Sequence, residues 1–218
     1  MTEAVAPALR RPRGRPRKTA DERDEGNRRQ ELLQHAARLF RQQGYAATTT
    51  RDIAAAAGMR AGSPFYHFEN KAALLFAVME QGMRAALQRQ AAAVQTVPAR
   101  AAPETLLRIL VRAHFDVLLG PGSDFVPVML YEWRSLKPAQ REHISKLQRD
   151  YEAAWADALQ ALAAAGSIRA DARIARLMML GALNWSVQWY KPKMGASLDE
   201  LTDAAMQLFV PQLDRRLP

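Results

Sequence analysis

Small hydroxyls, hydrogen-bonding aromatic rings and cations gather between residues 49 and 71. Thr49 and Ser63 lie where helices are expected to begin, and the backbone N–H groups at a helix start favour a phosphate. Lys71 supplies a point charge, while arginines reach either phosphates or base edges. The candidate contacts from this chemistry are Thr49, Arg51, Arg60, Ser63, Tyr66, His67 and Lys71. These side-chain types predict a nucleic-acid partner.

Helical periodicity, with start and stop signals, predicts four helices that position these side chains, at about 21–43, 49–57, 63–68 and 71–95. Gly44 is expected to end the first helix. Thr49 is the predicted N-cap of the second, with Asp52 completing a capping box, and Asn70 can cap the fourth. Two short helices joined by a turn with Gly58, and backed by a longer helix, predict a helix-turn-helix.

Three stretches, 44–54 (GYAATTTRDIA), 57–59 (AGM) and 62–71 (GSPFYHFENK), resemble the N-terminal domain of the TetR family. The resemblance runs without gaps from about residue 30 to residue 75. It implies that Thr49, Tyr66, His67 and Lys71 grip the DNA backbone. It also implies that Arg51 and residues 60–65 face bases, among them Arg60, Gly62, Ser63 and Pro64. Phosphate contacts would then position the protein and base contacts would specify the sequence.

Some of these side chains also have a purely structural interpretation. Tyr66 and His67 could pack within the small helical domain, Arg51 could be solvated, and Phe68 is expected in the core, as is Phe65. Pro64 departs from the family pattern, which usually has an apolar residue such as Leu at this position. Because proline lacks a backbone N–H, the recognition helix is predicted to start later, with Ser63 as its cap.

A basic arm precedes the first helix. The chain has a net charge of +9, and residues 1–18 carry six Lys or Arg against one Glu. The arm lacks a hydrophobic period and is expected to be disordered on its own. Its auxiliary DNA contacts are predicted at Arg13, Gly14, Arg15, Pro16 and Arg17, a Gly-Arg-Pro core typical of an AT-hook, which enters a narrow minor groove. The alternative is a non-specific electrostatic arm.

The rest of the chain reads as a helical body, with helices at about 104–119, 125–135, 138–165, 171–190 and 197–210. The predicted organisation is a basic arm at 1–20, a helix-turn-helix domain at 21–75 and a ligand-binding and dimerisation domain at 76–218. The helix at 171–190 is apolar on nearly all sides and must be covered. A homodimer through the last two helices, with twofold symmetry, is the predicted solution.

Soft, aromatic and hydrogen-bonding residues of the body could line an effector pocket: His114, Met129, Trp133, Arg134, Trp155, Met178 and Trp185. The alternative is an ordinary helical core. Residues 131–134 and 183–192 resemble a TetR-family branch that senses CoA thioesters in fatty-acid and sterol breakdown. That resemblance implies an acyl-CoA-like effector, whose phosphates could meet Arg134.

The sequence therefore predicts an all-α, ligand-responsive, sequence-specific DNA-binding regulator, a repressor by family habit, acting on a palindromic operator. The alternative is a constitutive architectural DNA-binding protein. There is no cysteine, the four histidines lack metal-ligand spacing, and nucleotide-binding and nucleophile motifs are missing, so neither an enzyme nor a metal or other cofactor is expected. No segment predicts a signal peptide or membrane span, and a cytoplasmic, nucleoid-associated bacterial protein is expected.

Overall fold

The structure, a computed structural model, describes residues 20–59, 67–191 and 195–211, with side chains from residue 26 onward. Every element in these ranges is helical, which confirms the all-α prediction. The helices are α1 (Ala20–Gln43), α2 (Thr50–Ala56), α4 (Lys71–Gln95), α5 (Pro103–Leu119), α6 (Phe125–Glu132), the 3₁₀ turn η1 (Trp133–Ser135), α7 (Pro138–Ala164), α8 (Ala172–Trp189) and α9 (Leu198–Phe209).

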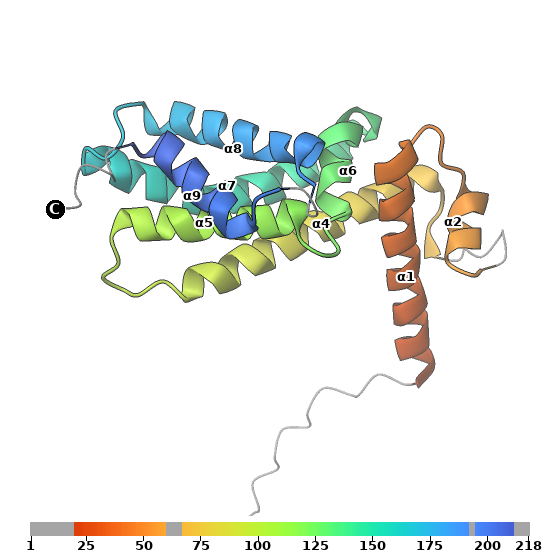
Figure 1. The fold of residues 1–218 in the computed structure, drawn as a ribbon. Helices are drawn as coiled ribbons and strands as arrows, with labels where there is room; N and C mark the ends of the chain where they lie inside the picture. Colours follow the sequence, from red (N-terminus) through yellow and green to blue (C-terminus); the bar gives the residue numbers. More distant parts are fainter. Residues whose placement is uncertain (1–19, 60–66, 192–194, 212–218) are drawn as a thin grey trace, which may run out of the picture.

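The N-terminal unit consists of α1, α2 and the first turns of α4, at one end of the molecule (Figure 1). Gly44 ends α1 with a φ of 84°, a left-handed conformation that favours glycine. Thr49 caps α2 and Asp52 completes the capping box. Both boundaries confirm the sequence prediction. The third short helix predicted at 63–68 falls largely outside the described residues.

The helix α4 connects the N-terminal unit to the body, which comprises the remainder of α4 and helices α5 to α9. The Asn70 side chain accepts a hydrogen bond of 2.9 Å from the N–H of Ala73, as a helix N-cap does. Leu74 and Leu75 are fully buried near the start of α4, and Met83 and Ala86 are buried further along the same helix. The predicted domain boundary at residue 75 therefore falls within one continuous helix, so a shift of α4 in the body moves its first turns as well.

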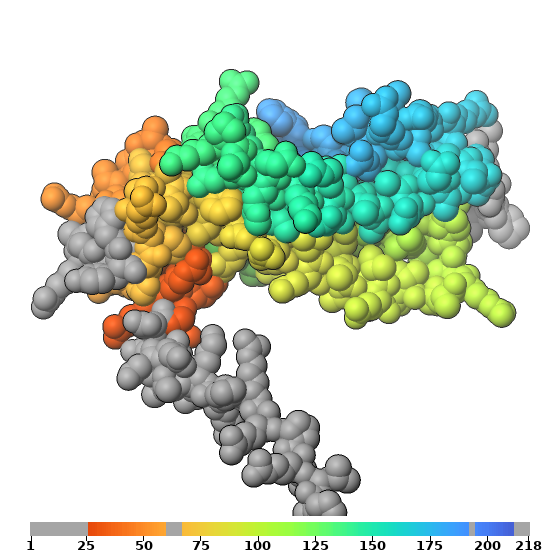
Figure 2. Space-filling model, turned by 180° about the vertical axis from the view of Figure 1, so that it is seen from behind, coloured from red at the N-terminus to blue at the C-terminus, as the bar shows by residue number. Residues whose placement is uncertain are grey.

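The core of the body lies between α4, α5 and α7, with α8 and α9 packed on the outside (Figure 1). Seen from behind, α7 lies between α4 and α8 (Figure 2). Trp155 of α7 is completely buried, and its indole N–H donates to the Gln90 side chain of α4 at 2.9 Å. The amide of Gln90 in turn donates to the backbone carbonyl of Tyr151 at 2.8 Å. These bonds satisfy polar groups that burial would otherwise leave unpaired.

Candidate nucleic-acid interface and effector cavity

Thr49 at the start of α2 is engaged in capping. Its hydroxyl accepts a hydrogen bond of 3.1 Å from the N–H of Asp52, and its own N–H donates to the Asp52 carboxylate at 2.8 Å. The hydrogen bonds from the Thr49 side chain and backbone lower the pKa of Asp52 below its ordinary value. Thr49 thus fixes the start of α2, the position at which a helix-turn-helix crosses the DNA backbone.

Lys71, predicted to grip a phosphate, has an internal role that the sequence did not indicate. Its ammonium donates to the backbone carbonyls of Tyr45 and Thr48, both at 2.9 Å, and lies 4.3 Å from the centre of the Tyr45 ring. These contacts join the first turn of α4 to the segment between α1 and α2. Lys71 therefore stabilises the orientation of α2, whereas its contact with DNA stays a prediction.

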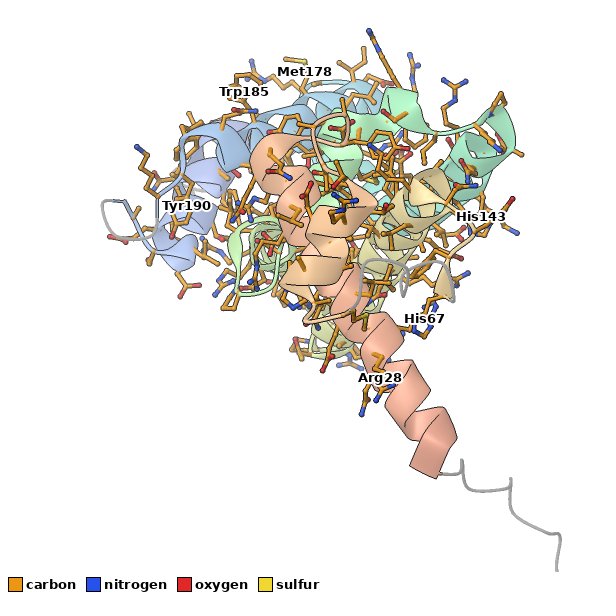
Figure 3. The ribbon with its side chains drawn as sticks, turned by 90° about the vertical axis from the view of Figure 1, so that its right-hand side faces the viewer. Arg28, His67, His143, Met178, Trp185 and Tyr190 are labelled. Atoms are coloured by element: carbon orange, nitrogen blue, oxygen red, sulfur yellow. The ribbon has the colours of Figure 1, made fainter. Side chains whose placement is uncertain are left out.

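Arg51 is exposed on α2, and His67 is half-buried just before α4. Figure 3 shows His67 and Arg28 at the same end of the molecule. Phe68 is buried, as predicted, and the guanidinium of Arg29 from α1 lies 4.9 Å above its ring. The other predicted DNA contacts lie outside the described residues: Arg60, Gly62, Ser63, Pro64 and Tyr66, and in the arm Arg13, Gly14, Arg15, Pro16 and Arg17.

A cavity of about 90 Å³, partly open to solvent, lies between α4, α5, α6, α7 and α8 of the body. Two of the predicted pocket residues line it, His114 and Met129. The imidazole of His114 hydrogen-bonds to the Tyr151 hydroxyl through Nδ1 at 2.8 Å and to the Asn184 side chain through Nε2 at 3.1 Å. Burial lowers the pKa of His114 to about 4, so the ring is neutral at pH 7.

The other five predicted pocket residues do not line this cavity. Trp155 packs behind it, its ring centre 5.5 Å from that of His114. Trp133 and Arg134 belong to η1, where Arg134 is exposed. Met178 and Trp185 depart most from the prediction, because their side chains are 67% and 64% exposed and project from the outer face of α8 (Figure 3). At 3.6 residues per turn, they lie on the face of α8 opposite the cavity-lining residues.

Sequence reasoning missed the main polar residues of the cavity. Tyr151 of α7 and Asn184 of α8 are not among the pocket residues predicted from the sequence. Both bond to His114, and Gln148 also lines the cavity. The available signal was Asn184 itself, since an amide on the inward face of an apolar helix needs a buried partner.

The helix α6 contacts both the cavity and the N-terminal unit. Met129 lines the cavity, while at the end of α6 the Glu132 carboxylate accepts a hydrogen bond of 2.8 Å from the N–H of Tyr45. Just before α6, Asp124 forms an ion pair of 3.0 Å with Arg41 of α1. The helix packs closely on α4 at Gly82, where a Cβ atom would lie only 2.9 Å from that of Phe125. A displacement of α6 would therefore reach α1 through Arg41 and the segment between α1 and α2 through Tyr45.

The outer face formed by α8 and α9 is apolar and exposed. Its large hydrophobic side chains, each at least half exposed, are Ile174, Leu177, Met178, Trp185, Trp189 and Leu208. A contiguous apolar surface of this kind marks an interaction site in most soluble proteins. Among the described helices, none is long and apolar enough to cross a membrane. No group of side chains within the described ranges has the composition and proximity needed to hold a metal ion.

Comparison with known proteins adds family evidence to this geometry. Residues 32–78 match the model of bacterial regulatory proteins of the tetR family, and residues 100–213 match that of the tetracyclin repressor-like C-terminal domain. The chain is 30% identical over 168 residues to the HTH-type transcriptional repressor KstR2 of Mycolicibacterium smegmatis. That alignment covers 76% of this chain and 80% of the relative.

Two solved structures show the same fold. The structure of AibR in complex with isovaleryl coenzyme A and operator DNA superimposes with a TM-score of 0.77 at 28% identity, covering 84% of this chain and 98% of AibR. The structure of the superantigen PfiT has a TM-score of 0.68 at 35% identity, with 83% of this chain and 95% of PfiT covered. The relatives named as regulators and the two matching domain models together agree with the helix-turn-helix predicted from the sequence.

Proposed function

The chain belongs to the TetR family of DNA-binding transcription regulators, and we propose that it is a repressor released from operator DNA by an acyl-CoA-like effector. The observation that carries the proposal is α6, which lines the cavity on one side and holds α1 on the other. The similarity to AibR, solved with isovaleryl coenzyme A and operator DNA, supports both parts of the proposal.

The DNA contacts that we propose follow the predicted helix-turn-helix. Backbone contacts come from Thr49, Tyr66, His67 and Lys71, and base contacts from Arg51 and the segment 60–65. The basic arm adds an electrostatic contribution that weakens with salt. Internal hydrogen bonds already hold Thr49 and Lys71, so their main contribution is to keep α2 in place for neighbouring side chains to reach DNA.

We propose that two copies pair through the outer face of α8 and α9. Exposed Met178 and Trp185 on α8 and Leu208 on α9 give this face an apolar centre. Pairing about a twofold axis makes the same patch meet itself, and it sets two recognition elements against half-sites about 34–36 Å apart. A palindromic operator follows from that symmetry.

Release follows from a two-state equilibrium. An effector in the cavity favours a position of α6 and α4 that changes the tilt of each N-terminal unit, and hence the separation of the two recognition elements. Repression is relieved only if the effector binds the DNA-incompetent state more tightly than the DNA-bound state. The contacts of Glu132 with Tyr45 and of Asp124 with Arg41 transmit the shift.

The test is a footprint of the purified protein on DNA flanking its own gene, repeated with acyl-CoAs of increasing chain length. We expect protection of one palindrome and loss of that protection with at least one acyl-CoA, whereas CoA alone leaves it intact. Protection that no acyl-CoA alters would favour the constitutive architectural protein. Protection of no discrete site would contradict sequence-specific regulation.

A further inference from the structure

A second hollow, here called the interdomain hollow, lies where α1 crosses α4 at the junction of the N-terminal unit and the body (Figure 1). It has a volume of about 340 Å³, is open to solvent and is bounded by α1, α4 and the segment 122–126 that leads into α6. Small-molecule sites are preferentially found in clefts at such junctions, typically of about 300–1,000 Å³. The interdomain hollow therefore has the position and the size of a ligand site.

The interdomain hollow and the effector cavity share one wall. Ala86 of α4, Val117 of α5 and Val126 of α6 line both of them. Because side chains in a packed wall move together, a ligand on one side that displaces α6 or α4 is felt on the other side. The two sites are thus placed to influence each other although they differ in chemistry.

Hydrogen-bonding side chains of the interdomain hollow form a stripe on each of two helices. On α1, Gln30, Gln34 and Arg38 follow one another at intervals of four residues, and on α4 Gln81 and Arg89 are eight residues apart. At 3.6 residues per turn, the members of each set lie on the same side of their helix. Each stripe therefore combines amide chemistry with one guanidinium group.

The two guanidinium groups of the interdomain hollow have no internal counter-charge. Neither Arg38 nor Arg89 forms an ion pair or a hydrogen bond with another residue of the described ranges. The one carboxylate among the described lining residues, that of Asp124, is already paired with Arg41 at 3.0 Å. Two positive charges thus face a concave surface whose acidic group is engaged elsewhere.

The surroundings do not change this balance. Asp116 lines a shallow depression together with Arg89, but its carboxylate forms an ion pair with Arg112 on the same helix. The amides of Gln30, Gln34 and Gln81 form no hydrogen bond within the part of the chain that the structure describes, so they also remain open to a ligand.

These groups select the chemistry of the ligand. A guanidinium group forms two parallel hydrogen bonds with a carboxylate or a phosphate, and two such groups match a ligand with at least two negative charges. Amide side chains both donate and accept hydrogen bonds, as hydroxyl groups do. The ligand class is a small organic anion with hydroxyl groups, such as a sugar phosphate or a hydroxy-polycarboxylate.

We propose that the interdomain hollow binds a small, hydroxyl-bearing organic anion, held by Arg38 of α1 and Arg89 of α4. Resting on the proposed function, this anion is a second effector. It connects α1 to α4 and thereby changes the affinity for operator DNA. Through the shared wall it also changes the affinity of the effector cavity for its own ligand, and linkage makes that effect reciprocal.

Calorimetric titration of the full chain with glucose 6-phosphate, citrate and glucose, at constant ionic strength, tests the site. We expect at least one of the two anions to bind with a Kd below about 1 mM. Glucose, which has the hydroxyl groups without the charge, should bind at least about tenfold more weakly. Comparison of the two anions shows whether phosphate or carboxylate is preferred. Binding of neither anion, or equal binding of glucose, would overturn the proposal.

Three arginine variants locate the binding site. Arg38→Gln and Arg89→Gln should each weaken anion binding by at least about tenfold, because each removes charge-assisted hydrogen bonds. Arg149→Gln loses the same charge from the exposed face of α7, so it is the matched control and should stay within about twofold. All three side chains are exposed, and urea unfolding should show little change in stability. Equal losses of affinity in the three variants would mean non-specific charge attraction and would overturn the site.

Operator gel shifts at matched ionic strength separate this inference from the proposed function. We expect a saturating anion to change operator affinity by at least about threefold in the unmodified protein and to leave it unchanged in Arg89→Gln. An anion that binds without altering operator affinity would contradict its role as an effector. Operator release by an acyl-CoA in a protein that binds neither anion would overturn the inference and leave the proposed function intact. Anion binding in a protein whose operator complex ignores every acyl-CoA would contradict the proposed function alone.

Discussion

The hydrogen bonds that shape the N-terminal unit mostly join neighbours in sequence, whereas those that shape the cavity join distant residues. Thr49 pairs with Asp52, and Asn70 caps its own helix at Ala73. In the cavity, His114 bonds to Tyr151 and Asn184, which lie 37 and 70 residues further along the chain. Local bonds persist as long as their own helix does, but the cavity bonds exist only while α5, α7 and α8 are packed together. The cavity is therefore the part of the molecule in which a ligand or a small helix displacement has the largest effect.

The largest expected difference between the two regions is in their response to acid. Burial depresses the pKa of His114 from 6.5 to about 4, so below pH 6.5 the unfolded chain takes up a proton that the folded chain resists. Stability should therefore fall as the pH drops from 6.5 towards 4, by roughly 2–3 kcal/mol from this one group. Urea unfolding at pH 7 and pH 4.5 measures the loss.

The variant His114→Gln cannot titrate and keeps hydrogen-bonding capacity, so it serves as the comparison for acid sensitivity. It should start less stable at pH 7 but lose less stability between the two pH values. Identical losses in the two proteins would contradict a neutral, buried His114.

A smaller effect is expected at the junction of the two regions. Glu132→Ala removes the acceptor of the Tyr45 N–H, and we expect it to lower the free energy of unfolding by about 1.5 kcal/mol, because hydrogen bonds to charged groups are the stronger ones. It should also raise the effector concentration needed to release operator DNA.

The control for this junction is Glu142→Ala, which breaks an exposed ion pair with Arg149 on α7. Exposed pairs contribute little, so stability should change by less than about 0.5 kcal/mol and operator release should not change. If both variants shift operator release equally, α6 does not transmit the signal through Glu132.

The smallest effect is expected from the local cap. Thr49→Ala removes one side of the capping box and should cost about 1 kcal/mol of stability. Thr49→Ser keeps the hydroxyl and should restore most of that loss. Gel-shift titration should show weaker operator binding for the alanine variant and near-normal binding for the serine variant. An unchanged affinity in Thr49→Ala would mean that the start of α2 does not contribute to DNA binding.

Much of the fold was predictable because its signals are local. Gly44, Thr49 and Asn70 mark helix ends through their own backbone or side-chain chemistry, and helical periodicity indicates the remaining helices. The prediction of the pocket residues was less successful because it relied on local signals as well. Residue type alone does not tell which side of α8 faces inward, so Met178 and Trp185 were chosen while Asn184 was overlooked.

By itself, the sequence determined the all-helical class, the helix boundaries and the family, since each depends on signals within a few tens of residues. Only the tertiary structure decided how the functional groups are used. The fold directs the Lys71 ammonium onto the carbonyls of Tyr45 and Thr48, and it orients the Asn184 amide through His114. The physical reason is that burial and hydrogen-bond partners are properties of packed helices, and residues from distant helices acquire them only when the chain has folded.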